Sequence, residues 1–423
     1  MKPFKKLGGN AGIYLGANVL NAGVPFLLLP LLTRILSPAD YGAIAMFAIV
    51  LSIMGAFTGL SVHGAISVRY FQMEKERLAE YVGACMAILA VSTALVFITV
   101  LLCAQPVTEL SGLPLDWVLV AIVLSGLQFI ANIRLVLYQV SGQANRYGAF
   151  QIGQTVLNAT LSLILVLSVG LAWQGRLIGQ ATAVALFGVA AAYLLYKDGL
   201  LLRPHNLKLL AGDALRFGVP MIPHTLGALL IVAVDRIVIT KVLGLATAGI
   251  YMVALQMGQV VGLLTDSFNK AYAPWLMKRL ADKDNVPRRA IVRGTYVYFV
   301  VVVSVALAIG AAAPWFLPLL VGNSFAPAAQ LIIYTTLGFA FSGCYYMVTN
   351  YIFFESKTAL LAMVTAVVGL LNVPLTIELV KANGAAGAGM AFMLTQFASF
   401  AGTWWLAHRT HPMPWLRAIV GTA

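Results

Sequence analysis

The chain has 423 residues, of which 61% are hydrophobic and only 10% are charged, and its formal net charge is +13. A soluble domain usually has roughly a quarter of its residues charged, so 27 basic and 14 acidic residues are too few for a soluble protein of this length. Three cysteines do not make a secreted disulfide scaffold, and no polar stretch reaches the roughly 50 residues of a separate soluble domain.

Twelve apolar runs have the length of a membrane-spanning helix, which needs roughly 20 apolar residues. They lie near residues 11–32, 41–66, 81–103, 117–138, 151–171, 177–196, 217–238, 249–268, 291–312, 327–352, 360–379 and 386–406. The first run lacks a convincing cleavage site and is interpreted as an uncleaved helix. We therefore expect an all-α integral membrane protein with about twelve transmembrane helices.

Basic residues gather on one side of this topology. Only Arg34, Arg176, Lys241 and Lys381 border the loops on the opposite side. The positive-inside rule then places both termini in the cytoplasm. The positive charge is thereby explained by topology, and we expect no nucleic-acid partner.

The chain divides into two halves of six helices each. The longer inside loop at 197–216 is a predicted cytoplasmic linker between an N-terminal lobe, 1–196, and a C-terminal lobe, 217–423. Because six is an even number, both halves enter from the same side, as in transporters with parallel repeats. The turn Arg34–Gly42 matches the turn Lys241–Gly249 in a cation, a leucine, an alanine and a glycine, which supports an internal duplication.

Polar side chains form stripes inside four of the predicted spans. Side chains in hydrocarbon must face other helices or a wet cavity. The stripes have two interpretations, helix-to-helix hydrogen bonds or a shared hydrated cavity, and four stripes in one chain favour the cavity. The candidate cavity-lining residues are Asn18, Asn21, Gln151, Gln154, Asn158, Gln256, Gln259, Tyr346 and Asn350, together with His224, which lies beside Pro220 and Pro223 where the helix should be disturbed.

Ionisable residues inside or beside the spans are the second group of candidates, because a charge at the bilayer centre costs at least about 2.5 kcal/mol. The candidate cations are Arg236, Arg134, Arg34, Arg69 and Arg293, and the candidate acids for ion coupling are Asp235 and Asp266. Each also has a structural interpretation. Arg134 and Arg34 can extend to the interface, Asp266 can pair with a basic residue, and Asp235 and Arg236 can each bond to another helix.

The sequence carries no motif of an enzyme. It has no Gly-rich phosphate loop followed by Lys-Ser/Thr and no His-Glu-x-x-His, so we expect neither catalysis nor a cofactor or metal site. Transport would then be driven by an ion gradient, by the membrane potential, by the substrate's own gradient or by a partner.

Two segments resemble a known family. The segment Leu7–Gly42 is similar to the first helix and turn of bacterial polysaccharide flippases of the Wzx type. The run Asp235-Arg236-Ile-Val-Ile, followed by Leu243-Gly244 and Gly249-Ile-Tyr251, resembles that family's seventh-to-eighth helix pattern. The resemblance implies the fold of the multidrug/oligosaccharidyl-lipid/polysaccharide flippase superfamily, in which two six-helix lobes surround a cavity that opens alternately to each side.

The resemblance also implies a function. The family moves an undecaprenyl-pyrophosphate-linked oligosaccharide, for O-antigen of lipopolysaccharide or another surface polysaccharide, across the bacterial inner membrane. The five candidate arginines would bind the pyrophosphate, and the amide and tyrosine stripes would meet sugar hydroxyls. Proton or sodium coupling, a polysaccharide polymerase and a chain-length regulator are the partners that this interpretation suggests.

Two other interpretations compete with it. A drug/cation antiporter of the same superfamily would share fold and topology but should carry more acids in its cavity. A membrane scaffold for polysaccharide enzymes would not need buried polar stripes. Flippases of the lipid-linked peptidoglycan precursor usually have two additional helices, which disfavours them here.

Overall fold

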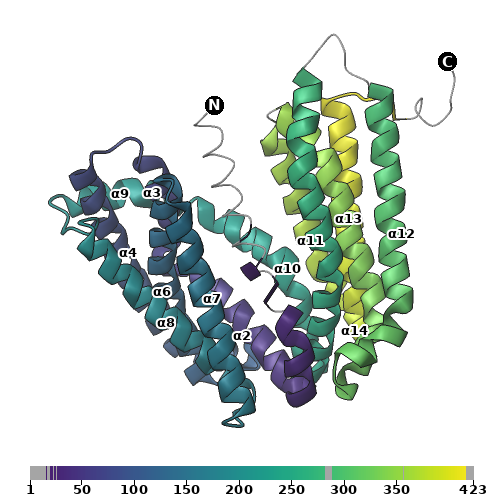
Figure 1. Ribbon diagram of the computed structural model, residues 1–423, viewed down its shortest axis with the longest axis horizontal. Coiled ribbons are helices and arrows are strands. Elements are labelled where there is room, and N and C mark those ends of the chain that lie inside the picture. The colour runs from purple at the N-terminus through teal and green to yellow at the C-terminus, as the bar shows by residue number, and fades with distance from the viewer. Residues whose placement is uncertain are drawn as a thin grey trace. The chain divides into compact units, whose positions relative to one another are not determined.

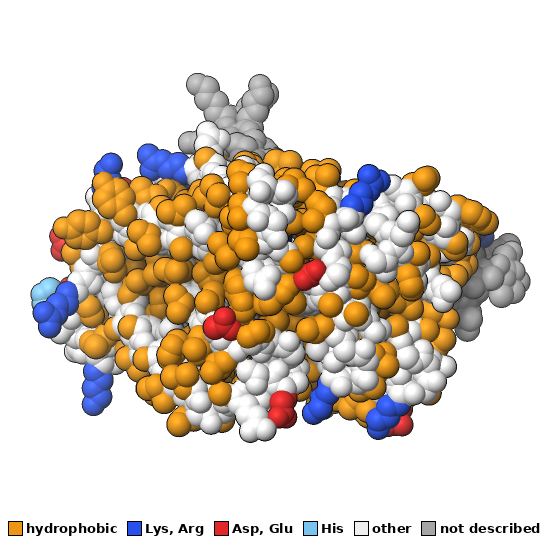
Figure 2. All heavy atoms as spheres, turned by 90° about the horizontal axis from the view of Figure 1, so that it is seen from below, with side chains coloured by type: hydrophobic (Ala, Val, Ile, Leu, Met, Phe, Trp, Pro, Cys, Tyr) orange, Lys and Arg blue, Asp and Glu red, His pale blue; other side chains and the backbone are white. Residues whose placement is uncertain are grey.

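The computed structural model describes residues 16, 20, 21, 23, 24, 26–281, 288–355 and 357–415, and every element in these ranges is a helix. Nine helices in this part of the chain are long and apolar enough to cross a membrane. Hydrophobic side chains cover most of the face that Figure 2 shows. The prediction of an all-α, multi-pass membrane protein is confirmed at this level.

The chain forms two compact units, Met1–Leu230 and Ile231–Ala423, here called unit 1 and unit 2. The boundary between them falls inside helix α10 (Met221–Leu243). Each unit is described by itself.

Unit 1 is a bundle in which α6 packs against α2 and α8, and α7 packs against α8 (Figure 1). An apolar helical segment, Phe26–Ile35, precedes the bundle. Its elements are α2 (Pro38–Phe57), η1 (Thr58–Ser61), α3 (His63–Arg69), α4 (Lys75–Leu102), α5 (Ala104–Ser111), α6 (Leu115–Val140), α7 (Ala144–Leu167), α8 (Trp173–Lys197) and α9 (Leu207–Gly218).

Helix α2 begins at a capping box that is readable in the sequence. The Ser37 hydroxyl accepts from the Asp40 backbone N–H, the Asp40 carboxylate accepts from the Ser37 backbone N–H, and Pro38 occupies the first turn. These groups satisfy N–H donors that a helix start leaves unpaired. The loop after the first predicted span therefore ends at a defined residue.

The second predicted span, 41–66, is interrupted in the structure. Helix α2 ends at Phe57, and Gly59, Leu60 and Ser61 follow with φ values of 72°, 49° and 56°. The Gly59 N–H, which leaves the helical ladder here, donates to the Ser92 hydroxyl of α4 at 2.8 Å. A second disturbance, predicted beside Pro220 and Pro223 in the run 217–238, is a break between two helices. Helix α9 ends at Gly218 and α10 begins at Met221, so Pro220 lies in the turn between them, and Pro223 lies in the first turn of α10, where a proline is compatible with a helix.

The segment 197–216, predicted as a linker, contains most of helix α9, which packs on unit 1. Figure 1 shows α3 and α9 together at one end of this unit. Leu210 and Ala214 of α9 are buried with Ile66 and Tyr81 in one hydrophobic cluster. Burial of this apolar side attaches the segment to the bundle.

Unit 2 is built around α13, which contacts α11, α12 and α14 (Figure 1). With the part of α10 that belongs to it, its elements are α11 (Leu245–Ala281), α12 (Arg288–Leu320), η2 (Asn323–Ala328), α13 (Ala329–Phe354) and α14 (Thr358–Thr410).

Helix α14 is a hairpin of two helices. Straight, its 53 residues would extend about 80 Å at a rise of about 1.5 Å per residue, far more than a hydrocarbon core of about 30 Å. The chain reverses at Gly384, where φ is 58° and ψ is −139°. The Thr395 hydroxyl of the second half donates to Asn372 Oδ1 of the first at 2.7 Å. The two halves coincide with the predicted runs 360–379 and 386–406.

Candidate functional site

Three amide side chains of α7 lie along one side of a spanning helix in unit 1. Gln151, Gln154 and Asn158 are all half-buried. Gln154 Nε2 donates to Gln128 Oε1 of α6 at 3.1 Å, and Gln128 Nε2 donates to Asn132 at 3.2 Å. The predicted stripe on this helix therefore extends onto its neighbour as a network of amides. Because the network is only half-buried, it still presents polar atoms at the surface of unit 1.

The same stripe continues toward the other end of α7 through an arginine. Arg176 of α8 donates from Nη1 to Asn158 Oδ1 at 2.8 Å and to the Ser162 hydroxyl at 3.0 Å. Sequence reasoning assigned Arg176 to a loop border and missed this role. A signal was available in the four-residue spacing of Gly175 and Gly179, which is typical of closely packed membrane helices.

Glycine is required for the close approach of α8 to α7 at Gly179. A Cβ on Gly179 would lie 2.5 Å from the Ser162 backbone nitrogen. Asn21, from the first helix, joins the row on another side, because its Oδ1 accepts from Thr155 of α7 at 2.7 Å. Helix α7 thus adds its own amides and hydroxyls to amides from two other helices and one guanidinium from a third.

In unit 2, Asp235 is the most deeply buried candidate acid, with 4% of its surface exposed. Its Oδ2 accepts from the buried Tyr251 hydroxyl at 2.6 Å, and its Oδ1 accepts from the Arg236 backbone N–H at 2.8 Å. No ion pair joins the Asp235 and Arg236 side chains in the described part of the chain. Sequence reasoning did not single out Tyr251 as the partner of Asp235.

Arg236 is half-buried, and its Nε is a buried donor without a hydrogen-bond partner among the described residues. A buried N–H that is left unpaired costs free energy. The arrangement therefore leaves Arg236 able to donate to an anion.

The other candidates of unit 2 differ in burial and in their partners. Asn350 Nδ2 donates to Asn269 Oδ1 at 2.9 Å, and Asp266 pairs with Lys270 one turn later at 2.6 Å. Gln256 is buried, Gln259 is exposed and Tyr346 is half-buried. The side chain of His224 and the whole of Asn18 lie outside the residues that the structure describes.

Arg69 is held by other protein groups. Its Nε and Nη2 donate to the two carboxylate oxygens of Asp213 on α9 at 2.9 and 2.6 Å, and Tyr81 donates to Asp213 at 2.9 Å. Burial alone would raise the pKa of Asp213, but the hydrogen bonds from Arg69 and Tyr81 outweigh it and lower that pKa. The hydrogen bond to Asp213 raises the pKa of Arg69. This cluster joins α3, α4 and α9.

The remaining candidate cations differ in burial. Arg34 and Arg293 are exposed. Arg134 is 2% exposed, forms an ion pair with Asp198 and lies 4.2 Å over the Tyr138 ring. Its position near the end of α6 does not bring the side chain out to the surface.

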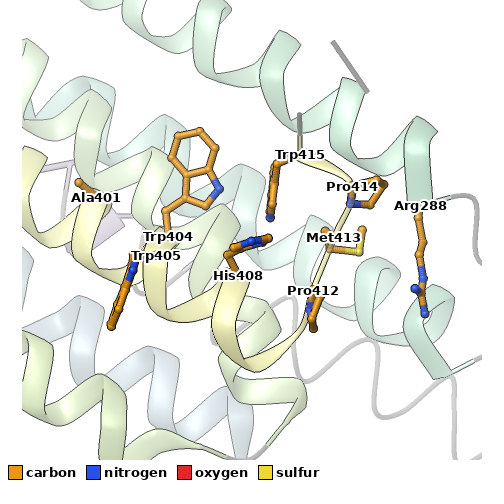
Figure 3. A pocket seen from close by; sticks show the side chains of 9 residues that line it. All are labelled: Arg288, Ala401, Trp404, Trp405, His408, Pro412, Met413, Pro414 and Trp415. Atoms are coloured by element: carbon orange, nitrogen blue, oxygen red, sulfur yellow. The ribbon is translucent and has the colours of Figure 1, made fainter. Parts of the chain in front are cut away.

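An aromatic pocket of about 690 Å³ lies where α14 ends. Figure 3 shows His408 between Trp404 and the segment that carries Met413 and Trp415, with Arg288 on the far side. Tryptophans of this kind are typical of membrane interfaces. None of the residues that line this pocket was a candidate from the sequence.

Apolar spans with polar rows inside them define a multi-pass membrane protein of the transporter type, and the comparisons agree with this class. The chain belongs to the family described as polysaccharide biosynthesis protein, whose model matches residues 7–280. The resemblance seen in the sequence is thereby confirmed at the level of the family.

Two relatives come from Haemophilus influenzae. "Lsg locus putative protein 1" is 24% identical over 374 residues, which cover 86% of this chain and 87% of that protein. An "Uncharacterized membrane protein" is 25% identical over 361 residues, covering 82% and 84%. The similarity thus extends over most of both chains.

Two solved structures share the fold. An inward-facing multidrug resistance MATE family transporter of the MOP superfamily has a TM-score of 0.72 at 14% identity, with 92% of this chain and 94% of that chain covered. The lipid II flippase MurJ, in an inward closed conformation, has a TM-score of 0.74 at 13% identity, with 94% and 87% covered. At these identities the likeness concerns the fold.

Proposed function

We propose that this protein is a flippase that moves undecaprenyl-pyrophosphate-linked oligosaccharide units of O-antigen or another surface polysaccharide. The direction is from the cytoplasmic to the periplasmic leaflet of the bacterial inner membrane, by alternating access. The observation that carries the proposal is the half-buried amide row of α7, Gln151, Gln154 and Asn158. Amides in hydrocarbon need partners, and sugar hydroxyls both donate and accept hydrogen bonds.

The proposed topology has twelve spans with both termini in the cytoplasm. The nine candidate spans include α14, which counts twice because it reverses at Gly384. Helix α10, with 23 residues, and the first apolar run supply the other two. We propose that these twelve spans form two lobes of six helices related by an internal duplication, as the matching turns Arg34–Gly42 and Lys241–Gly249 suggest.

The pyrophosphate requires a cation inside the spans, because an isolated ion in hydrocarbon costs tens of kcal/mol by Born estimates. We assign this role first to Arg236, whose buried Nε lacks a partner among the described groups. A charge-assisted hydrogen bond from a guanidinium is stronger than a neutral one. Arg34 and Arg293 remain secondary candidates, and Arg69 is already committed to Asp213.

The drug/cation antiporter is the second candidate, and the MATE-like fold is compatible with it. Such a function needs acids that can change protonation or bind a cation. Asp235 is already hydrogen-bonded by Tyr251 and Asp266 is paired with Lys270. Both remain proposed ion-coupling candidates, but this arrangement favours an anionic substrate.

The test replaces one amide of the α7 row and compares it with the same change elsewhere. Gln154→Leu should reduce translocation of lipid-linked oligosaccharide in proteoliposomes and surface polysaccharide in cells by at least about tenfold, the factor equivalent to about 1.4 kcal/mol. Gln105→Leu is the matched control, because Gln105 is exposed on the short helix α5 and bonds Glu109.

Both variants are compared at equal membrane abundance. Normal translocation by Gln154→Leu would remove the amide row from the substrate path. Export of cationic drugs with no movement of lipid-linked oligosaccharide would favour the antiporter. Intact transport with loss of polymer assembly would favour the scaffold.

A further inference from the structure

Two adjoining pockets open at the end of unit 1 where α4 and α7 begin and α6 and α8 end. Their volumes are about 580 and 560 Å³, within the range of about 300–1,000 Å³ that small-molecule sites occupy. They share Arg134, Tyr138, Arg146 and Asp198. The basic residues at these helix ends indicate that the pockets face the cytoplasm.

Arg134 forms the buried wall between the two pockets. Its side chain is only 3% exposed, and one nitrogen, Nη2, pairs with Asp198. Its Nε is buried and has no hydrogen-bond partner in the described part of the chain. A buried guanidinium with an unused donor is an unfavourable arrangement, which a bound acceptor would relieve.

The charges around Arg134 are predominantly positive. Lys75, Arg146 and Lys197 are exposed at the rims of the two pockets, and Asp198 is the acid in their linings. Lys75 and Arg146 belong to the first turns of α4 and α7, where unpaired backbone N–H groups and the helix dipole favour an anion. Because α6 and α8 end at the same place, their C-terminal dipoles oppose those of the two helix starts, and the attraction for an anion comes mainly from the fixed cations.

The chemistry of the lining limits the ligand. Three cations outside the Arg134–Asp198 pair suit a group with more than one negative charge, and guanidinium groups match phosphate oxygens in geometry. The larger pocket also has apolar walls at Met73, Leu78, Leu137 and Leu200. An apolar wall beside a cationic rim suits an amphiphile as well as a free anion.

We propose that these pockets form a phosphate-binding site of unit 1, with Arg134 as its buried donor and Lys75, Arg146 and Lys197 as its rim. The phosphate is either the head group of a membrane lipid or a soluble phosphate. Binding here does not require translocation, so the proposal stands or falls separately from the flippase function.

The test measures ligand binding by the full-length protein in detergent, by native mass spectrometry. The probes are phosphatidylglycerol, inorganic pyrophosphate and diacylglycerol, which lacks the phosphate. Arg146→Gln removes a rim cation whose Nη1 bonds the Gln143 side chain. Arg203→Gln is the matched control, because Arg203 is exposed at the same end but lines neither pocket.

Arg146→Gln should weaken phosphate binding by at least about tenfold, since it removes a charge-assisted hydrogen bond, whereas Arg203→Gln should leave it unchanged. The double variant Arg134→Met/Asp198→Leu removes the buried cation together with its half-buried partner, so no unpaired charge is left behind, and it should abolish binding. If these variants lose binding of phosphatidylglycerol, the natural ligand is a membrane lipid. If they lose binding of pyrophosphate, the natural ligand is a soluble phosphate.

Three results would overturn the proposal. One is unchanged affinity for both phosphate probes in Arg146→Gln and in the double variant. Another is an equal loss in Arg203→Gln, which would indicate diffuse attraction by the basic end. The third is diacylglycerol binding equal to that of phosphatidylglycerol together with no binding of pyrophosphate, which would show that the phosphate contributes nothing.

Discussion

The break in the second span depends on one hydroxyl, and replacing it should destabilise unit 1. Ser92 is buried, accepts the Gly59 N–H at 2.8 Å and donates to the Leu89 carbonyl at 3.1 Å. In Ser92→Ala the Gly59 N–H is left in an apolar environment without its partner. The expected loss is about 1–2 kcal/mol of unfolding free energy, roughly 5- to 30-fold in the unfolding equilibrium.

The backbone at the break between α2 and α3 is strained. Leu60 and Ser61 hold left-handed φ values, which cost roughly 1–2 kcal/mol per residue for side chains other than glycine. Denaturant unfolding in detergent micelles measures the change. Ser92→Thr keeps the hydroxyl and should retain most of the stability.

The control is a Ser→Ala substitution at a position where the hydroxyl bonds only within its own helix. The Ser52 hydroxyl of α2 is exposed and donates to the Ala48 carbonyl of its own helix at 2.8 Å. Ser52→Ala should change stability by less than about 0.5 kcal/mol. If Ser92→Ala and Ser52→Ala were equally stable, the hydrogen bond would not be what holds the break.

Three further predictions concern other parts of the chain. Asp213→Asn should lower the unfolding free energy by up to about 1 kcal/mol at pH 7. Because the pKa of Asp213 is lowered in the fold, this contribution is present above pH of about 4 and is lost as the pH falls through the folded pKa. Denaturant titrations of the variant and the parent should therefore converge in acid. Gly387→Ala should abolish folded protein in fluorescence size-exclusion chromatography, because its Cβ would lie 1.9 Å from the Leu379 carbonyl oxygen. The control Gly294→Ala, with no atom within 4 Å of its Cβ, should fold normally. A well-folded Gly387→Ala would contradict the hairpin geometry. In proteoliposomes, Asp235→Asn should still transport after the proton and sodium gradients are collapsed, since the potential favours outward movement of negative charge by about 2.3 kcal/mol per charge per 100 mV; transport that stops in the parent protein when the gradients collapse would instead assign ion coupling.

Much of the candidate site was accessible from helical spacing. The stripe on α7 was predicted from Gln151, Gln154 and Asn158, which the structure places together on one helix side. Spacing could not reveal that Arg176 belongs to the same row, because its contact with Asn158 depends on how closely α8 approaches α7. The partner of Arg69 was equally hidden, since Asp213 lies in a segment that was interpreted as a linker.

The sequence by itself determined the class of this protein and the approximate location of its spans. Hydrophobic length is a property of consecutive residues, and a helix in lipid satisfies its own backbone, so both can be read locally. Tertiary structure alone decided where the second span breaks and which cations are already paired. Those outcomes depend on side chains from distant helices, such as Ser92 opposite Gly59 and Asp198 beside Arg134, and the packing of helices, not their order along the chain, brings such groups within hydrogen-bonding distance.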